Sequence, residues 1–188
     1  MYIGIFCASA DQIHEAYFKD AAELGKGIAA RGWGIVYGGT NCGLMRGIAE
    51  AVLADGGKVI GVIPECIRER GVAAEGITEL VMAPDMKERK QLMRERADAF
   101  IALPGGWGTL EEITEVVTLK QLGNHHKPIL FLNTNGFYDR FFEFIRDSGE
   151  KGFISKAYDE LYTVVDRIED VFSYIENYCE KCIADKYA

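Results

Sequence analysis

The sequence contains no long hydrophobic run and few cysteines. No apolar stretch approaches the roughly 18–20 residues of a bilayer-spanning helix, so we expect no membrane partner. The chain begins with an apolar stretch, where a secretory signal peptide would carry positive charge, so we expect no signal peptide. The five cysteines are irregularly spaced, which is typical of free thiols in a reducing cytoplasm. These absences predict a cytoplasmic protein.

Positive charge is also scarce. There are 21 Lys and Arg residues against 29 Asp and Glu residues, which gives a net charge of −8. A surface of this sign repels nucleic-acid backbones, so we expect no nucleic-acid partner. A small anionic ligand would need local basic residues. With 188 residues, 48% of them hydrophobic and 27% charged, the chain resembles an ordinary globular protein. We expect residues 1–188 to form a single domain.

Patterns that bind metals or perform nucleophilic catalysis are missing as well. Cys179 and Cys182 form a C-x-x-C, but no second pair accompanies it, and a metal or redox role is disfavoured. His125 and His126 are adjacent on a predicted loop without a third ligand, so they are interpreted as surface residues. No Ser-His-Asp arrangement is visible. We therefore expect neither a metal nor a cofactor.

Short apolar runs alternate with stretches of helical periodicity along the whole chain. This alternation predicts βαβ units and hence an α/β fold, a doubly wound Rossmann-like parallel sheet with helices on both faces. The carboxyl ends of all its strands then share one edge, where ligands of such sheets bind. The strands are expected at residues 2–7, 34–37, 58–63, 77–82, 99–103, 127–132 and 161–165. Residues 65–76 are polar and are predicted to be a mobile connection.

The chain is organised around residues 99–115, A-F-I-A-L-P-G-G-W-G-T-L-E-E-I-T-E. Its apolar start predicts a buried strand, which Pro104 ends. Gly105, Gly106 and Gly108 allow a sharp turn and a close approach to a ligand. Thr109 is expected to cap the next helix. A strand, a glycine turn and a helix N-terminus together favour a phosphate site, although a tight turn without function would look similar.

Acidic residues follow this turn closely. Glu111 and Glu112 fall in the first helical turn, where the helix dipole favours negative charge. Helical spacing places Glu111, Glu115 and Thr118 on one face, so we expect them to line the same pocket as the loop. The alternative is that these glutamates are simply solvated.

Two further segments are expected at this pocket. Residues 38–45, G-G-T-N-C-G-L-M, form a second glycine turn after a strand, which brings Gly38 and Gly39 to the same sheet edge. Residues 86–97 predict a helix whose methionines should face the sheet and carry Arg89 inward, with Lys90 beside it.

These motifs identify a resemblance. M-K-E-R-K-Q-L-M at 86–93, followed by P-G-G-W-G-T-L-E at 104–111, resembles the paired signature of the Lonely Guy family, which is also labelled lysine decarboxylase-like. The similarity extends through I-F-C-A-S at 5–9, G-G-T-N-C-G-L-M at 38–45 and V-I-G-V-I-P at 59–64, and so covers nearly the whole chain. Two positions depart from the pattern: Trp107 replaces the usual Tyr, and Arg46 replaces a Gly.

The resemblance implies a Rossmann-like homodimer that hydrolyses the N-glycosidic bond of a nucleoside 5′-monophosphate to free base and ribose 5-phosphate. Family members act on N6-prenylated adenosine monophosphates, and many bacterial ones also on AMP. The aromatic segment 137–144 offers an apolar contact face for the dimer. Which of these nucleotides is the natural substrate stays open.

Carried over by position, Arg89 and Glu111 match the catalytic pair of the family, and Lys90, Gly106, Gly108, Thr109 and Thr118 match its nucleotide contacts. Glu111 would stabilise positive charge on the ribose or direct water, with help from Glu115, as nucleophile or as electrostatic stabiliser. The amides of residues 106–109 would hold the phosphate. Arg89 would orient the substrate. The full predicted substrate-binding set is Ser9, Gly38, Gly39, Lys90, Gly105, Gly106, Trp107, Gly108, Thr109, Glu112, Glu115 and Thr118.

Two other functions remain open at this point. The loops could hold a phosphorylated ligand without chemistry, as a non-catalytic nucleotide-binding or phosphate-binding protein, but a pure anion binder gains nothing from a carboxylate beside the phosphate. Amino-acid decarboxylation would need pyridoxal phosphate on a Schiff-base lysine. Only Lys90 is a candidate for that role, and it sits in a charged run.

Overall fold

The structure, a computed structural model, describes residues 1–180. Its strands form one seven-stranded sheet in which every neighbouring pair is parallel, in the order β4-β3-β2-β1-β5-β6-β7. The predicted α/β parallel fold is confirmed. The strands are β1 Tyr2–Phe6, β2 Gly34–Tyr37, β3 Lys58–Pro64, β4 Glu79–Ala83, β5 Ala99–Ala102, β6 Ile129–Leu132 and β7 Thr163–Val165.

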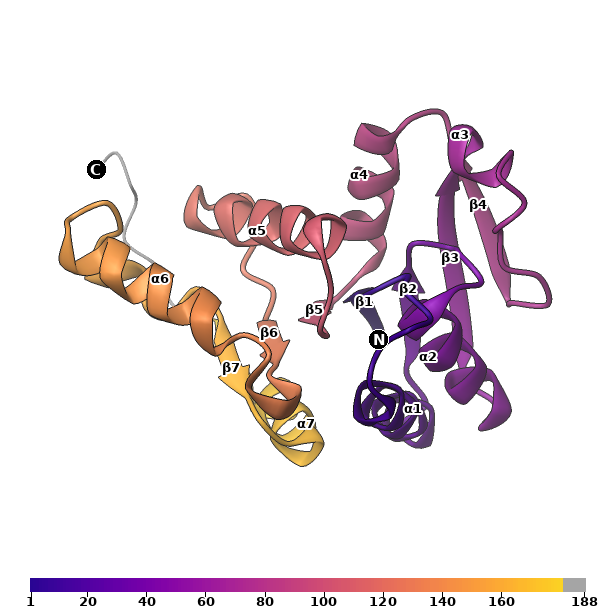
Figure 1. The fold of residues 1–188 in the computed structure, drawn as a ribbon, viewed down its shortest axis with the longest axis horizontal. Coiled ribbons are helices and arrows are strands. Elements are labelled where there is room, and N and C mark those ends of the chain that lie inside the picture. Colours follow the sequence, from indigo (N-terminus) through magenta and orange to yellow (C-terminus); the bar gives the residue numbers. More distant parts are fainter. Residues whose placement is uncertain (181–188) are drawn as a thin grey trace.

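Helices cover both faces of this sheet, as Figure 1 shows, with α4 and α5 on one side and α1, α2 and α7 on the other. The helices are α1 Glu15–Ala30, α2 Gly43–Ala54, α3 Glu65–Arg68, α4 Met86–Arg96, α5 Trp107–Gln121, α6 Asp139–Glu150 and α7 Ile168–Glu176, with 3-10 turns η1 Thr134–Gly136 and η2 Lys156–Tyr158.

The core follows from the alternation of side chains along buried strands. On β1, Ile3 and Ile5 face the cluster that contains the apolar stripes of α1, α2 and α7. Phe6 faces the opposite cluster, with Met93 of α4 and Ile113 of α5. Because both faces of these strands are buried, their sequences are continuous apolar runs and do not alternate between apolar and polar residues.

The strand order reverses between β1 and β5, so the loops after these two strands separate and leave a crevice at the carboxyl edge of the sheet. The 99–115 segment lies at this crevice. It consists of β5, the glycine turn that follows β5, and the first turns of α5. The fold therefore places the predicted phosphate loop where open α/β sheets bind ligands.

The 65–76 connection differs from its prediction as a mobile loop. It begins with the short helix α3, and then returns to the β2–α2 loop, where Thr40 and Ala73 form an antiparallel bridge. The Asn41 N–H donates to the Val72 carbonyl at 2.8 Å, and the Ala74 N–H donates to the Gly39 carbonyl at 2.9 Å. These bonds join residues too distant in sequence for local patterns to reveal.

His14 directly precedes α1, and its Nδ1 accepts a hydrogen bond from the Ala16 N–H at 3.2 Å, which caps the helix. Helix α7 ends at Glu176. The C-x-x-C interpretation rests on Cys182, which lies outside the described residues. Cys7, Cys42, Cys66 and Cys179 are free.

Candidate active site

A cavity of about 530 Å³ opens at the crevice, within the usual range of roughly 300–1,000 Å³ for a small-molecule site. Five segments contribute to its wall: the ends of β1 and β2 with the start of α2, the 65–76 connection, α4, and the loop into α5. The predicted site residues that line it are Ser9, Gly38, Arg89, Gly106, Trp107, Gly108, Thr109 and Glu112. The two glycine loops therefore converge on one cavity, as expected.

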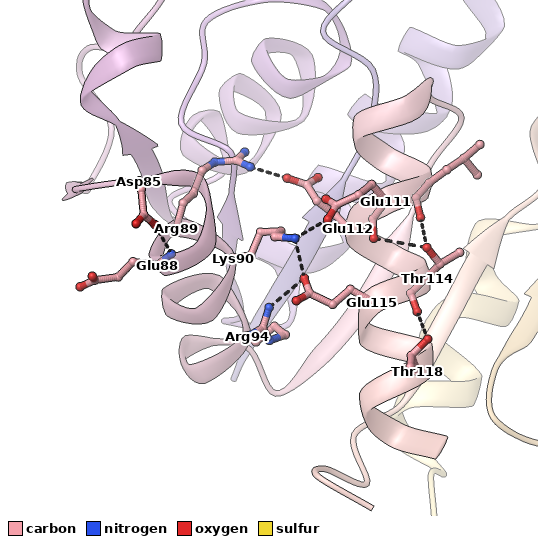
Figure 2. A network of polar contacts seen from close by, with 11 residues as sticks. Asp85, Glu88, Arg89, Lys90, Arg94, Glu111, Glu112, Thr114, Glu115 and Thr118 are labelled. Carbon is pink, nitrogen blue, oxygen red and sulfur yellow. Dashed lines mark hydrogen bonds and ion pairs between the residues drawn. The ribbon is translucent and has the colours of Figure 1, made fainter. Parts of the chain in front are cut away.

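A buried ion pair lies at the inner wall of this cavity. Nη1 of Arg89 donates to Oε1 of Glu112, and both side chains are only 7% exposed. Figure 2 shows the pair bridging α4 and α5. The Arg89 Nε–H also donates to the carbonyl of Val62 at 3.0 Å, at the end of β3. Because two of its nitrogens are held, the guanidinium has a fixed orientation beside the cavity.

The remaining polar atoms of this pair are available to a ligand. Within residues 1–180, no hydrogen bond uses Oε2 of Glu112 or Nη2 of Arg89, and both residues line the cavity. Burial raises the pKa of Glu112, although the Arg89 charge and hydrogen bond act against this effect. The arrangement presents a carboxylate and a guanidinium side by side, in a partly dehydrated setting where charges act strongly.

Cys7 lines the same cavity from the end of β1. Burial, and secondarily the Glu112 charge, raises the pKa of this thiol well above its ordinary value. Because a thiol must ionise to act as a nucleophile, Cys7 serves this wall as a small neutral group.

The prediction that Glu111, Glu115 and Thr118 line the cavity is wrong. Figure 2 shows Glu111 and Glu115 turned toward Lys90, whose ammonium donates to Glu111 and lies 3.1 Å from Oε2 of Glu115. The Glu111 side chain is 54% exposed. The Thr118 hydroxyl donates to the Thr114 carbonyl of its own helix at 2.8 Å. None of these four side chains reaches the cavity wall.

The reason is the phase of helix α5. Consecutive helical residues point about 100° apart, so Glu111 and Glu112 cannot share a face. Glu112 lies one turn from Val116, which is buried, and Glu111 lies one turn from Glu115 on the side facing α4. There Arg94 adds a third cation, 3.0 Å from Oε2 of Glu115. This α4–α5 network holds the two helices together and so positions the Arg89–Glu112 pair.

The glycine turn at residues 105–108 also differs in detail from its prediction. Helix α5 begins earlier than expected, with Gly106 as its N-cap, so Thr109 lies in the first turn and does not cap it. Thr109 is buried against Gly105, where an added Cβ would stand 2.1 Å from its Oγ1. Gly105 thus supports the loop from behind instead of lining the cavity. Trp107 lies at the cavity mouth and is 90% exposed.

The second glycine loop makes room for the ion pair. A Cβ on Gly38 would stand 2.2 Å from Nη2 of Arg89. The neighbouring Gly39 lies behind the cavity wall, where its positive φ of 74° brings it against β3. Arg46, at the position that departs from the family pattern, pairs with Asp11 at 2.8 Å and so ties α2 to the loop after β1.

We expect Gly38→Ala to lower activity strongly and also to destabilise the fold. The new methyl group would overlap Nη2 of Arg89 and displace the guanidinium from its hydrogen bonds to Glu112 and Val62. The control is Gly47→Ala on α2, where the nearest atom would lie 3.7 Å away. This control should keep full activity and gain about 0.5–1 kcal/mol of stability. Activity and thermal unfolding are measured for both variants, and a fully active Gly38→Ala protein would contradict the role of this close approach.

Known proteins with similar sequences identify the family of this chain. The family model described as "Possible lysine decarboxylase" matches residues 45–175. A protein of Oryza sativa subsp. japonica, the probable cytokinin riboside 5′-monophosphate phosphoribohydrolase LOGL3, is 40% identical over 93% of this chain and 82% of its own length. The chain belongs to the Lonely Guy family. The phosphoribohydrolase LOG3 of Arabidopsis thaliana is 39% identical over 98% of this chain and 86% of its own.

Solved structures of this architecture extend beyond these relatives. The molybdenum cofactor binding protein of Rippkaea orientalis superposes with a TM-score of 0.71 at 20% identity, covering 93% of this chain and 94% of its own. At this identity the likeness concerns the fold alone.

In residues 1–180, no group of three or more His, Cys, Asp or Glu side chains is placed to hold a metal ion. His125 is partly buried instead of at the surface: its Nε2 lies 2.9 Å from the Val116 carbonyl, and burial lowers its pKa to about 4. Within the same range, no helix combines the length and apolar character needed to cross a bilayer.

Proposed function

We propose that this protein hydrolyses the N-glycosidic bond of a purine nucleoside 5′-monophosphate, releasing the free base and ribose 5-phosphate. The observation that carries the proposal is the Arg89–Glu112 pair, which lines the cavity together with the loop at the start of α5. The activities named for its Oryza and Arabidopsis relatives support it. The non-catalytic alternative leaves the buried carboxylate without a use.

The chemistry assigns a task to each part of the cavity. When the bond between C1′ and the base nitrogen breaks, its electron pair leaves with the base, which gains a proton, and positive charge develops on the ribose. Oε2 of Glu112 stabilises this charge, accepts a proton from the water that adds to C1′ and passes that proton on to the released base. Nη2 of Arg89 donates to the ribose or the leaving group. The catalytic role that the sequence suggested for Glu111 thus passes to Glu112.

The 5′-phosphate is assigned to the loop at the start of α5. The first amides of a helix lack partners within it, and the helix dipole favours an anion there. α5 has no side-chain cap at Gly106, so no side chain competes for these groups. Residues 106–109 all line the cavity. This places the phosphate at the helix start and the sugar deeper, toward Glu112.

The test is product analysis with AMP and an N6-prenylated AMP assayed side by side. We expect free base and ribose 5-phosphate from at least one nucleotide, and much slower turnover of the matching nucleosides. The comparison also identifies the better substrate. Binding of the nucleotides without base release would instead support the non-catalytic function.

Decarboxylation finds little support in the placement of Lys90. A Schiff-base lysine needs a lowered pKa and a cavity position. Burial lowers the pKa of Lys90, but hydrogen bonds to Glu111 and Glu115 outweigh this effect and raise it. The ammonium faces the α4–α5 network instead of the cavity. The residues present therefore do not fit pyridoxal phosphate.

The pH dependence should carry the signature of Glu112. Because its pKa is raised above the ordinary 4.5 and its charged form is the active one, kcat/KM should fall as pH decreases through that raised pKa. The Glu111 charge contributes to the rise, so Glu111→Gln should move this limb to lower pH. The substrate phosphate also titrates, at about pH 6, but its limb would not move with the variant. A limb that disappears in Glu111→Gln would make Glu111 the titrating acid.

We further propose a homodimer, formed through the outer face of α5. Trp107, Leu110, Thr114 and Val117 follow one another at helical spacing along α5. Trp107 is exposed, whereas Leu110 and Val117 are partly exposed and also pack against the core. The Thr114 hydroxyl donates to the Leu110 carbonyl at 2.6 Å, so its methyl group is left for a neighbour. A partly exposed apolar stripe of this kind is typical of an interface.

Light scattering with two variants tests this dimer. Val117→Arg, at the C-terminal end of the stripe, should give monomers. The matched variant Phe144→Asp should stay dimeric, because Phe144 lies on α6 and is not part of that stripe. A monomeric wild type would contradict the dimer, and a monomeric Phe144→Asp with a dimeric Val117→Arg would place the interface on the aromatic segment 137–144.

The free cysteines support the proposal of a cytoplasmic protein.

A further inference from the structure

One cationic side chain that lines the cavity has no ion-pair partner in the described part of the chain. Only two cationic residues of the described chain face the cavity, Arg89 and Arg70. Arg89 is neutralised by Glu112. Lys90 is held by carboxylates outside the cavity, and Arg46 is paired with Asp11. Arg70 makes no ion pair or side-chain hydrogen bond with any residue in the described part of the chain, so it carries the cavity's one unbalanced positive charge.

The backbone holds Arg70 at this position. Its N–H donates to the Ile67 carbonyl at 3.0 Å, at the end of α3. Two residues later the chain is tied to the β2–α2 loop through Val72. Ile67 and Val72 line the cavity on either side of Arg70. The 65–76 connection is thus an ordered wall that presents one exposed guanidinium to the cavity.

A dianionic phosphate requires such a charge. The protein carries a net charge of −8, and amides at a helix start contribute only partial charges. With Arg89 and Glu112 cancelling each other, a cavity without Arg70 would offer no full positive charge to the ligand. A guanidinium also matches the geometry of a phosphate, with two parallel N–H donors.

We propose that Arg70 binds the 5′-phosphate from the side opposite the residue 106–109 amides, and thereby makes the site select nucleotides over nucleosides. This inference rests on the proposed function for the identity of the ligand. Arg70 acts in binding, and Glu112 and Arg89 act on the glycosidic bond. The wall formed by residues 65–76 then has a definite task, which is to close the phosphate end of the cavity.

The experiment compares Arg70→Ala with Arg68→Ala. Arg68 lies on α3, outside the cavity lining, 3.6 Å from Glu65, so its variant is the matched control for loss of one cation. We expect Arg70→Ala to raise the KM for the nucleotide about 10- to 100-fold, the loss typical of a hydrogen bond to a charged group, with kcat little changed. Calorimetric Kd values for ribose 5-phosphate should rise in parallel, whereas turnover of adenosine should not change. Arg70→Lys should recover part of the loss, and Arg68→Ala should behave as wild type.

The outcomes separate this inference from the proposed function. If Arg70→Ala keeps wild-type KM and ribose 5-phosphate affinity, or loses nucleotide and nucleoside equally, the inference is overturned even though hydrolysis stands. If wild type binds ribose 5-phosphate through Arg70 but cleaves no nucleotide, the phosphate contact stands and the hydrolase fails. A wild-type protein that binds neither the nucleotide nor ribose 5-phosphate overturns both the inference and the proposed function. Because Arg70 is exposed, thermal unfolding of Arg70→Ala should match wild type and show that the fold is intact.

Discussion

Glu112→Gln should lower kcat about 100- to 1,000-fold, the loss typical of removing a group that stabilises charge in the transition state. The amide keeps the size of the side chain and can still accept from Arg89, so the cavity should remain formed. Only the negative charge next to the ribose is lost. The measurement is the steady-state rate of base release at saturating nucleotide.

Glu111→Gln is the matched control for this variant. It removes the same charge one residue away, from a side chain that is half exposed and bound to Lys90 in the α4–α5 network. A partly exposed ion pair contributes about 0–1 kcal/mol, so we expect a small change in stability and near wild-type kcat. A larger loss of kcat in Glu111→Gln than in Glu112→Gln would return the catalytic role to Glu111.

Arg89→Met should abolish activity and also destabilise the fold by about 3–5 kcal/mol, because it leaves Glu112 as a buried carboxylate without a partner. For a chain of this length, that loss corresponds to a decrease in Tm on the order of 10 °C. Denaturant unfolding and thermal unfolding measure the two quantities.

The double variant Arg89→Met with Glu112→Leu separates stability from catalysis. Replacing both members of a buried ion pair by apolar residues is often neutral, so most of the lost stability should return while activity stays absent. An Arg89→Met protein as stable as wild type would show that Glu112 escapes burial or is protonated. A double variant no more stable than Arg89→Met would show that the pair has additional structural partners.

The fold and the location of the site follow from local patterns that the sequence displays openly. Apolar runs ended by glycine or proline predict buried parallel strands, and topology then brings their carboxyl ends to one edge. The loops after β1, β2 and β5 meet there as predicted, and Arg89 enters from α4. Each of these steps depends on residues close in sequence.

The carboxylate that lines the cavity is Glu112, one residue after the Glu111 to which the sequence motif pointed. The buried stripe of α5 includes Thr109, Ile113 and Val116, which puts Glu112 on the inner side and Glu111 on the flank. That signal was present in the apolar spacing. Arg70 had no comparable signal, because its wall is held by a bridge between Thr40 and Ala73 that only the folded chain forms.

The most direct test is a crystal structure of Glu112→Gln with AMP bound. The account predicts the phosphate on the amides of residues 106–109, and the glycosidic bond within reach of the side chains at 89 and 112. A nucleotide whose ribose lies against Glu111 and Lys90, or whose base instead of phosphate occupies the glycine loop, would contradict it.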